Sequence, residues 1–279
     1  MTTLQTFQKQ KEYLICVDSD GCAMDTMDCK HIRCFGPCMV QEWQLDAWKP
    51  EILKRWNEVN LYTMTRGVNR FKGLAIALGE INARYCTIPG IDVFADWTKQ
   101  AKELSNRALE EKIAAGADSI FAKALHWSKS VNKAIEQMPE AEKKTFPHVA
   151  EGLAAAHRAA DVAVVSSANR EAVIEEWKRC GLLEYVDVLC CQEAGTKSAC
   201  LCALKKQGYA PDHILMVGDA PGDQIAAAEN GVYFYPIMVR HEPESWTELT
   251  EKAISLFVSG GYTAYGENKE IEFRQNLGE

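Results

Sequence analysis

The chain has 279 residues, of which 47% are hydrophobic and 25% are charged, and its formal net charge is −8. This composition is that of a globular protein with one large domain or two ordinary ones. The acidic charge argues against nucleic acid or an anionic membrane as the main partner. The first residues are too polar for a signal peptide, and no apolar run approaches the roughly 20 residues of a membrane span, so we expect a cytoplasmic protein.

The first predicted element is a buried strand, YLICV at residues 13–17, which ends at two carboxylates one residue apart. These are Asp18 and Asp20, and Gly21 after them allows the chain to turn sharply. An isolated Asp-x-Asp-Gly is most often only a turn. A catalytic interpretation therefore depends on polar residues at the ends of the neighbouring strands.

The next segment, residues 25–146, contains no convincing strand. Apolar residues at helical spacing predict helices over residues 46–59, 68–78, 96–116 and 118–138. The last two each begin at an aspartate that is placed to cap the helix. We expect an all-helical cap domain here, inserted after the first strand.

The start of this insert holds four soft ligands within ten residues, namely Cys29, His31, Cys34 and Cys38. Zinc is one interpretation, but there is no C-x-x-C pair, and structural zinc sites usually take their ligand pairs from separate segments. The chain has eleven cysteines and no secretion signal, which favours reduced thiols. We therefore predict thiols that line a hinge or core.

The chain returns to a sheet in residues 147–258. Short apolar runs (VAVVS, VDVLCC, ILMVG and VYFYP) alternate with helices at 170–181 and 223–231, a pattern typical of a parallel sheet covered on both faces. We predict an α/β fold with a doubly wound parallel sheet, built discontinuously from residues 1–24 and 147–258. Residues 259–279 form a C-terminal tail with too little pattern to predict packing.

Polar side chains follow the later strands as well. Ser166 follows one strand, Lys197 follows the next, and Asp219 and Asp223 in GDAPGD follow the third. Ligands bind at the carboxyl ends of parallel strands, so we expect these side chains to meet. Each also has a plainer interpretation: Ser167 beside Ser166 as a helix cap, Lys197 as a surface lysine, and Asp223 as an N-cap.

Carboxylates gathered in one crevice repel one another and need a cation. Oxygen ligands alone suit a hard ion such as Mg²⁺, and together with Lys197 it would attract a phosphate. Asp18 can then attack phosphorus as a nucleophile, while Asp20 donates and accepts protons. Ser166 can donate a hydrogen bond to a phosphoryl oxygen.

These motifs, in this order at strand ends, resemble the four motifs of the haloacid dehalogenase superfamily. The helical insert after the first motif looks like the type 1 cap of that superfamily. The resemblance implies an aspartyl-phosphate intermediate at Asp18, acid–base work at Asp20, and a phosphoryl group held by Ser166 and Lys197.

The same resemblance implies how Mg²⁺ would be held. Its ligands would be Asp18, the backbone carbonyl of Asp20 and Asp219. Asp223 would bind the ion or lie next to it.

Within the superfamily, Asp20 argues against haloacid dehalogenases proper and phosphonoacetaldehyde hydrolases. Asp25 and Thr26 resemble the D-T-x-x-x-H stretch of beta-phosphoglucomutases, but the histidine falls one residue late, at His31, with Lys30 in its place. We therefore favour a phosphatase. A sugar-phosphate mutase or phosphotransferase is one alternative, and a catalytically silent phosphometabolite-binding protein is another.

The expected partner is a small phosphorylated metabolite, whose identity is not encoded in these motifs. Thr26, Arg66 and Arg70 are possible specificity residues, the two arginines because they could neutralise a second anionic group. The alternative for the arginines is a solvated, basic helix start.

Overall fold

The computed structural model describes residues 2–279 and contains two compact units. The sheet unit comprises the chain up to Met27 and again from Glu140 to Glu279, and the helical unit is Asp28–Pro139. The predicted division, at residues 24/25 and 146/147, differs from this one by a few residues.

The sheet unit is built on a parallel sheet of six strands in the order β1-β4-β3-β2-β5-β6. The strands are β1 (Thr2–Thr3), β2 (Leu14–Val17), β3 (Asp161–Val165), β4 (Val188–Cys190), β5 (Ile214–Gly218) and β6 (Tyr233–Pro236). Every residue of β2, β3, β4 and β5 is buried, as the continuous apolar runs predicted. The predicted α/β fold is confirmed, and β1 is an edge strand that the pattern did not indicate.

The strand order reverses at β2. Leu14 is in register with Asp161 of β3 on one side and with Ile214 of β5 on the other. The chain continues from β3 to β4 on the first side and from β5 to β6 on the second. In such a sheet the crevice for a ligand lies at the carboxyl ends of the two strands where the order reverses, here β2 and β5.

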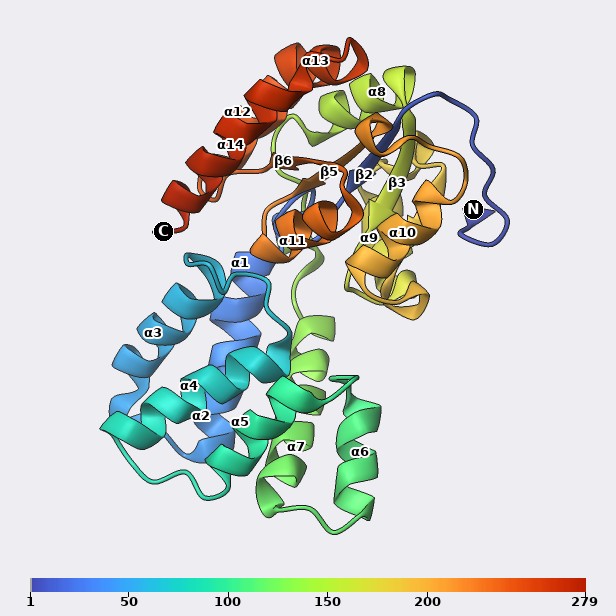
Figure 1. The fold of residues 1–279 in the computed structure, drawn as a ribbon. Helices are drawn as coiled ribbons and strands as arrows, with labels where there is room; N and C mark the ends of the chain where they lie inside the picture. Colours follow the sequence, from blue (N-terminus) through green and yellow to red (C-terminus); the bar gives the residue numbers. More distant parts are fainter. Residues whose placement is uncertain (1) are drawn as a thin grey trace. The chain divides into compact units, whose positions relative to one another are not determined.

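Seven α-helices of the described chain surround the sheet: α8 (Val149–Ala159), α9 (Arg170–Arg179), α10 (Lys197–Lys205), α11 (Pro221–Asn230), α12 (Glu242–Glu248), α13 (Ile254–Val258) and α14 (Tyr262–Asn276). Figure 1 shows α8 beside α13 and α10 beside α11. The predicted ends of α9 and α11 are confirmed, because Gly181 and Gly231 follow them with φ angles of 70° and 65°.

The C-terminal segment is part of the sheet unit and not a separate tail. Helix α14 packs on β6, and its Tyr262 and Phe273 are fully buried. The Tyr262 hydroxyl donates to the carbonyl of Phe234 at 2.7 Å. Only a few apolar residues anchor this helix among many polar ones, so periodicity did not reveal it.

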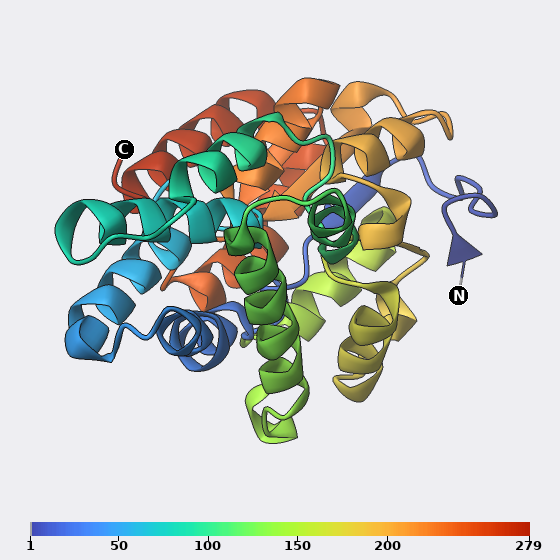
Figure 2. The same ribbon diagram turned by 90° about the horizontal axis from the view of Figure 1, so that it is seen from below.

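The helical unit begins within the short helix α1 (Met27–Lys30), which a π-helical turn (His31–Phe35) follows. Its helices are α2 (Gly36–Trp43), α3 (Lys49–Leu61), α4 (Arg70–Arg84), α5 (Ile91–Gln100), α6 (Asn106–Ala114) and α7 (Ser119–Glu136). Figure 1 and Figure 2 both show α6 beside α7. Trp56, Phe71 and Trp127 are buried in its separate apolar core.

One helix prediction in this unit is wrong. The expected helix over 96–116 is interrupted between α5 and α6, and Asp96 lies inside α5 instead of capping it. Ser105 caps α6 by accepting the Ala108 N–H at 3.2 Å. The predicted cap of α7 is confirmed, because Asp118 accepts the Ile120 N–H at 3.0 Å.

The cysteines and histidine of the predicted zinc alternative lie along α1, the π turn and α2. All eleven cysteines are free thiols, and His31 stacks on Phe35 with 4.5 Å between ring centroids. Within residues 2–279, the group of metal-ligating side chains with suitable spacing is a different one, composed of aspartates. The structure therefore gives the zinc interpretation no support. No helix of the described chain combines the length and apolar character needed to cross a bilayer.

Candidate active site

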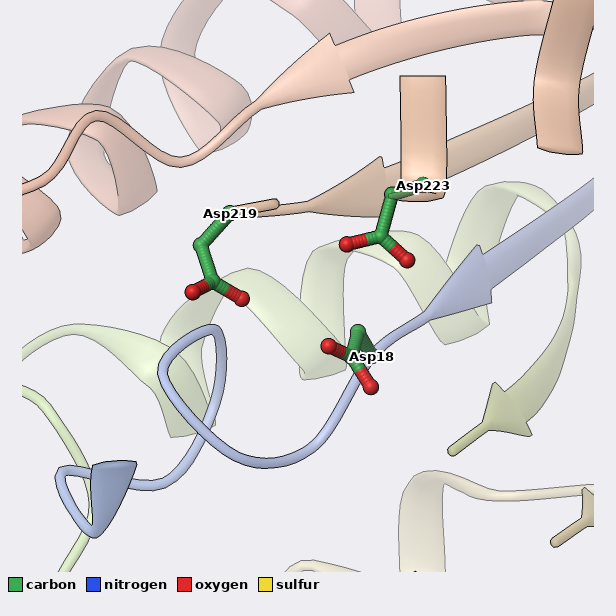
Figure 3. Close-up of side chains that lie close together, drawn as sticks. All are labelled: Asp18, Asp219 and Asp223. Carbon is green, nitrogen blue, oxygen red and sulfur yellow. The ribbon is translucent and has the colours of Figure 1, made fainter. Parts of the chain in front are cut away.

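Three aspartates meet at the carboxyl ends of the central strands. Asp18 follows β2, Asp219 follows β5, and Asp223 lies in the first turn of α11 (Figure 3). Each offers a carboxylate oxygen within 4.8 Å of the other two, and the three side chains are buried. The structure thus brings together three of the predicted site residues, although Asp18 precedes the other two by about 200 positions in the sequence.

Lys197 is the cation of this cluster. It begins α10, and its Nζ lies 2.8 Å from Asp18 Oδ2 and 2.6 Å from Asp223 Oδ1. Burial by itself would lower the pKa of Lys197, but the Asp18 and Asp223 carboxylates outweigh it and raise that pKa, which keeps the ammonium charged. The surface-lysine interpretation is therefore wrong.

The acidic cluster carries more negative charge than Lys197 balances. Burial raises the pKa of Asp223 to about 7, and Asp18 and Asp219 add to this effect while Lys197 opposes it. Three carboxylates and one ammonium leave a net charge of about −2 when all are ionised. Oxygen ligands of this charge are the set that a hard divalent cation binds, so the donors present fit Mg²⁺.

The approach of α11 to β5 depends on a glycine that the sequence pattern did not single out. A Cβ on Gly218 would lie 2.3 Å from Asp223 Cγ, so only glycine allows this carboxylate to reach the strand end. Asp223 Oδ2 also accepts the Ala220 N–H at 3.2 Å. The N-cap of α11 is Ala220, so the interpretation of Asp223 as the N-cap residue is wrong. The signal that could have revealed Gly218 is a glycine as the last residue of a buried strand, directly before Asp219.

The loop after β2 carries the other predicted carboxylate. Asp18 continues the strand pairing through its N–H to the Val217 carbonyl at 3.0 Å, and the chain then turns at Gly21, where φ is 83°. Asp20 is partly exposed, and Thr26 donates a hydrogen bond from its hydroxyl to Asp20 Oδ1. The Asp20 side chain thus lies outside the acidic cluster and is oriented by Thr26; a metal contact through its carbonyl stays a prediction.

Ser166 lies at the end of β3, the neighbour of β2. It is 4% exposed, and its hydroxyl oxygen accepts the Ala168 N–H at 3.1 Å. The expectation that Ser167 caps the next helix is wrong, because Asn169 caps α9 by accepting the Ala172 N–H at 2.9 Å. A phosphate contact for Ser166 stays a prediction.

Arg66 and Arg70 lie in the helical unit and have partners there. Arg66 is buried, donates to the Leu61 carbonyl at 2.8 Å and lies 3.6 Å from Asp28. Arg70 donates to Asn132 Oδ1 at 2.7 Å. Their predicted contribution to specificity stays a prediction, as does that of Thr26.

Residues 91–237 match the family model described as haloacid dehalogenase-like hydrolase, and this match covers more than half of the chain. The chain belongs to the haloacid dehalogenase-like hydrolase family. The matched segment includes Ser166, Lys197, Asp219 and Asp223, whereas Asp18 precedes it and the helices α12 to α14 follow it.

Solved structures similar to this chain share little sequence with it. A haloacid dehalogenase-like family protein from Streptococcus pneumoniae is 11% identical, with a TM-score of 0.48, covering 86% of this chain and 91% of that one. CbbY from Rhodobacter sphaeroides, in complex with phosphate, is 15% identical, with a TM-score of 0.44, covering 81% and 87%. Similarity at these values says nothing about activity. A search of curated proteins gives no match.

Proposed function

We propose that this hydrolase cleaves a small phosphomonoester with Mg²⁺, through an aspartyl-phosphate intermediate on Asp18. The observation that carries the proposal is the buried group of Asp18, Asp219 and Asp223, with Lys197 Nζ within 2.8 Å of two of them. A buried cluster of carboxylates destabilises the fold unless a bound cation compensates its negative charge. A phosphate ester brings the anion that such a cation and lysine would bind.

The nucleophile in this proposal is the Asp18 carboxylate. It is held at the end of the central strand by its backbone hydrogen bond to Val217, so it needs little reorganisation before attack. Its oxygen forms a bond to phosphorus while the bond between phosphorus and the ester oxygen breaks. Lys197 stays charged beside it and neutralises negative charge on the transferring group.

Asp20 is the proposed acid and base. Its carboxyl gives a proton to the departing ester oxygen, and the carboxylate then takes one from the water that attacks the phosphorus of the acyl phosphate. This second step releases inorganic phosphate and restores Asp18. The hydrogen bond from Thr26 fixes one oxygen of the Asp20 carboxylate. It therefore also fixes the direction in which the other oxygen points.

Mg²⁺ would be held by Asp18 and Asp219, with Asp223 binding it or lying beside it. When bound there, it supplies positive charge next to the phosphoryl oxygens and lets two anions approach each other. The structure's own contribution is the dry, preorganised donor set: Asp219 and Asp223 are 0% exposed and Asp18 is 5% exposed. The substrate's identity, specificity residues in the helical unit and a cytoplasmic location belong to the proposal as expectations.

The experiment is a phosphate-release screen over a panel of phosphorylated metabolites, run with Mg²⁺ and with EDTA. The matched variants are Asp18→Asn, which removes the nucleophile at nearly constant volume, and Asp212→Asn, the same change at an exposed aspartate of the sheet unit. We expect release from a few related esters with Mg²⁺ alone, a loss of at least about a thousandfold in Asp18→Asn, and no change in Asp212→Asn.

Mg²⁺-dependent release at the wild-type rate by Asp18→Asn would refute the intermediate. No release from any ester would remove the phosphatase assignment. Trapping of phosphate on Asp18 would then identify a mutase or phosphotransferase, and a Mg²⁺-dependent rise in melting temperature without trapping would identify a silent binding protein.

A further inference from the structure

The loop after β2 is held by two buried tryptophans that the proposed mechanism does not use. We call residues 18–24 the nucleophile loop. Trp177 of α9 donates from its indole N–H to Ser19 Oγ at 2.9 Å. Trp246 of α12 donates from its indole N–H to the Cys22 carbonyl at 3.0 Å. Two helices distant in the sequence thus contact one short loop through the same chemical group.

Both acceptor residues also take part in the loop's own backbone hydrogen bonds, through other atoms. The Ser19 carbonyl accepts the N–H groups of Cys22, Ala23 and Met24 at 3.3, 3.0 and 2.8 Å, and Ser19 and Cys22 are both fully buried. Both indoles are 0% exposed. A hydrogen bond in such a dry environment is electrostatically stronger than in water, and its loss leaves a buried acceptor without compensation from water.

The position of Ser19 determines what these bonds control. Ser19 lies between Asp18 and Asp20 in the sequence. The preceding residue, Asp18, is already fixed by the hydrogen bond from its N–H to the Val217 carbonyl. With Ser19 held as well, the backbone that directs both carboxylates has little freedom. Displacement of a reacting group by about 1 Å costs on the order of a hundredfold in rate, so this restraint matters for turnover.

The space for Trp246 is made by a glycine in a third helix. A Cβ on Gly152 of α8 would lie 2.5 Å from Trp246 Cε3, so the indole packs directly on the helix backbone. Helix α12 is itself fixed, because the Tyr235 hydroxyl donates to the Ser245 carbonyl at 2.8 Å. Trp246 lies beyond residue 237, where the family match ends.

We propose that Trp177 and Trp246 are positioning residues for the proposed reaction, holding the nucleophile loop through their indole N–H groups. The segment after residue 237 then contributes to the active site, because its Trp246 holds the nucleophile loop. The catalytic meaning of this inference rests on the proposed function of Asp18 and Asp20. The restraint on the loop does not, and it can be measured without any substrate.

The test compares Trp177→Phe and Trp246→Phe with Trp127→Phe. Trp127 is a matched control, because it is also 0% exposed and donates to a backbone carbonyl, that of Phe35 at 3.1 Å, within the helical unit. Amide hydrogen exchange of the nucleophile loop is measured relative to that of β3 and β5, and kcat and KM are measured on the best ester of the screen.

We expect loop exchange to rise about tenfold in each of the two variants, with kcat falling about tenfold and KM changing by less than about twofold. Trp127→Phe should leave both quantities unchanged. Ser19→Ala removes the Trp177 acceptor, so adding it to Trp177→Phe should cause no further loss of kcat. Ser19→Ala also replaces Trp177→Phe as the test if that variant does not fold.

Unchanged loop exchange in the folded variants would overturn the inference. So would faster exchange with kcat unchanged, or an equal effect of Trp127→Phe on the loop. A wild-type protein that hydrolyses no ester would refute the proposed function alone, and loop exchange would still decide whether the indoles hold the loop.

Discussion

Replacing Lys197 by Met tests how the buried acidic cluster is stabilised. The change keeps the length of the side chain and removes the ammonium that lies 2.8 Å from Asp18 and 2.6 Å from Asp223. Removing one partner of a buried ion pair costs about 3–5 kcal/mol of unfolding free energy. We expect a loss of this size at pH 7.5 in EDTA.

The loss has an upper limit that depends on pH. A carboxyl left without its cation can bind a proton, at a cost of about 1.4 kcal/mol for each pH unit above its ordinary pKa of about 3.9, or roughly 4–5 kcal/mol at pH 7. A folded-state pKa raised in this way lowers stability as pH rises. The deficit of Lys197→Met should therefore grow between about pH 4 and pH 7.5.

The assay is urea denaturation in EDTA at pH 5 and pH 7.5. Unfolding is detected through amide exchange within β2, so that the measurement reports on the sheet unit. Lys129→Met is the control, because Lys129 pairs with Glu110 at the same 2.8 Å but both side chains are exposed. That change should cost at most about 1 kcal/mol. If Lys197→Met loses less than about 1 kcal/mol at pH 7.5, or loses as much at pH 5, the reasoning about the cluster is wrong.

Three further outcomes are expected. Asp20→Ala should slow both formation and breakdown of the phosphoenzyme in rapid-quench experiments, and an unchanged rate across the pH range would remove its acid–base role. Asp161→Ala should lower the free energy of unfolding by about 3 kcal/mol, because this buried carboxylate accepts two backbone N–H groups and the Tyr209 hydroxyl; a loss below about 1 kcal/mol would contradict this. Because burial raises the pKa of Asp223 to about 7, its contribution should make metal-free stability fall between about pH 4 and pH 7, and Asp223→Asn should show a weaker fall in denaturation curves; an identical pH dependence would refute it.

The parallel sheet and the convergence of three aspartates could be predicted because both follow from local patterns. Continuous apolar runs mark buried parallel strands, and parallel strands bring their carboxyl ends to one edge. Asp18 and Asp219 needed only these two rules. The interruption of the 96–116 helix was not predictable in the same way, since the interruption includes residues 101–104, all four of which favour helix, before Ser105 starts the new one.

The restraint on the nucleophile loop could not be read from the sequence. Trp177 is a buried residue of an ordinary amphipathic helix, and nothing local shows where an indole N–H is directed. Trp246 lies in a segment without strong periodicity, and its partner Cys22 is over 200 residues away. Such hydrogen bonds depend on tertiary packing, and the sequence patterns of helices and strands carry no information about it.

The order of strands also has a consequence for the protein as it is synthesised. β2 leaves the ribosome well before its neighbours β3 and β5, which begin only at Asp161 and Ile214. The apolar strand that carries Asp18 therefore stays unpaired while more than half of the chain is made, although the helical unit with its own core can already fold. Nascent chains that stop before β5 would expose an unpaired edge of β2, the kind of surface that chaperones cover and that aggregates. Slow closure of this long-range pairing is then a late step in folding, and the surroundings of Asp18 form last.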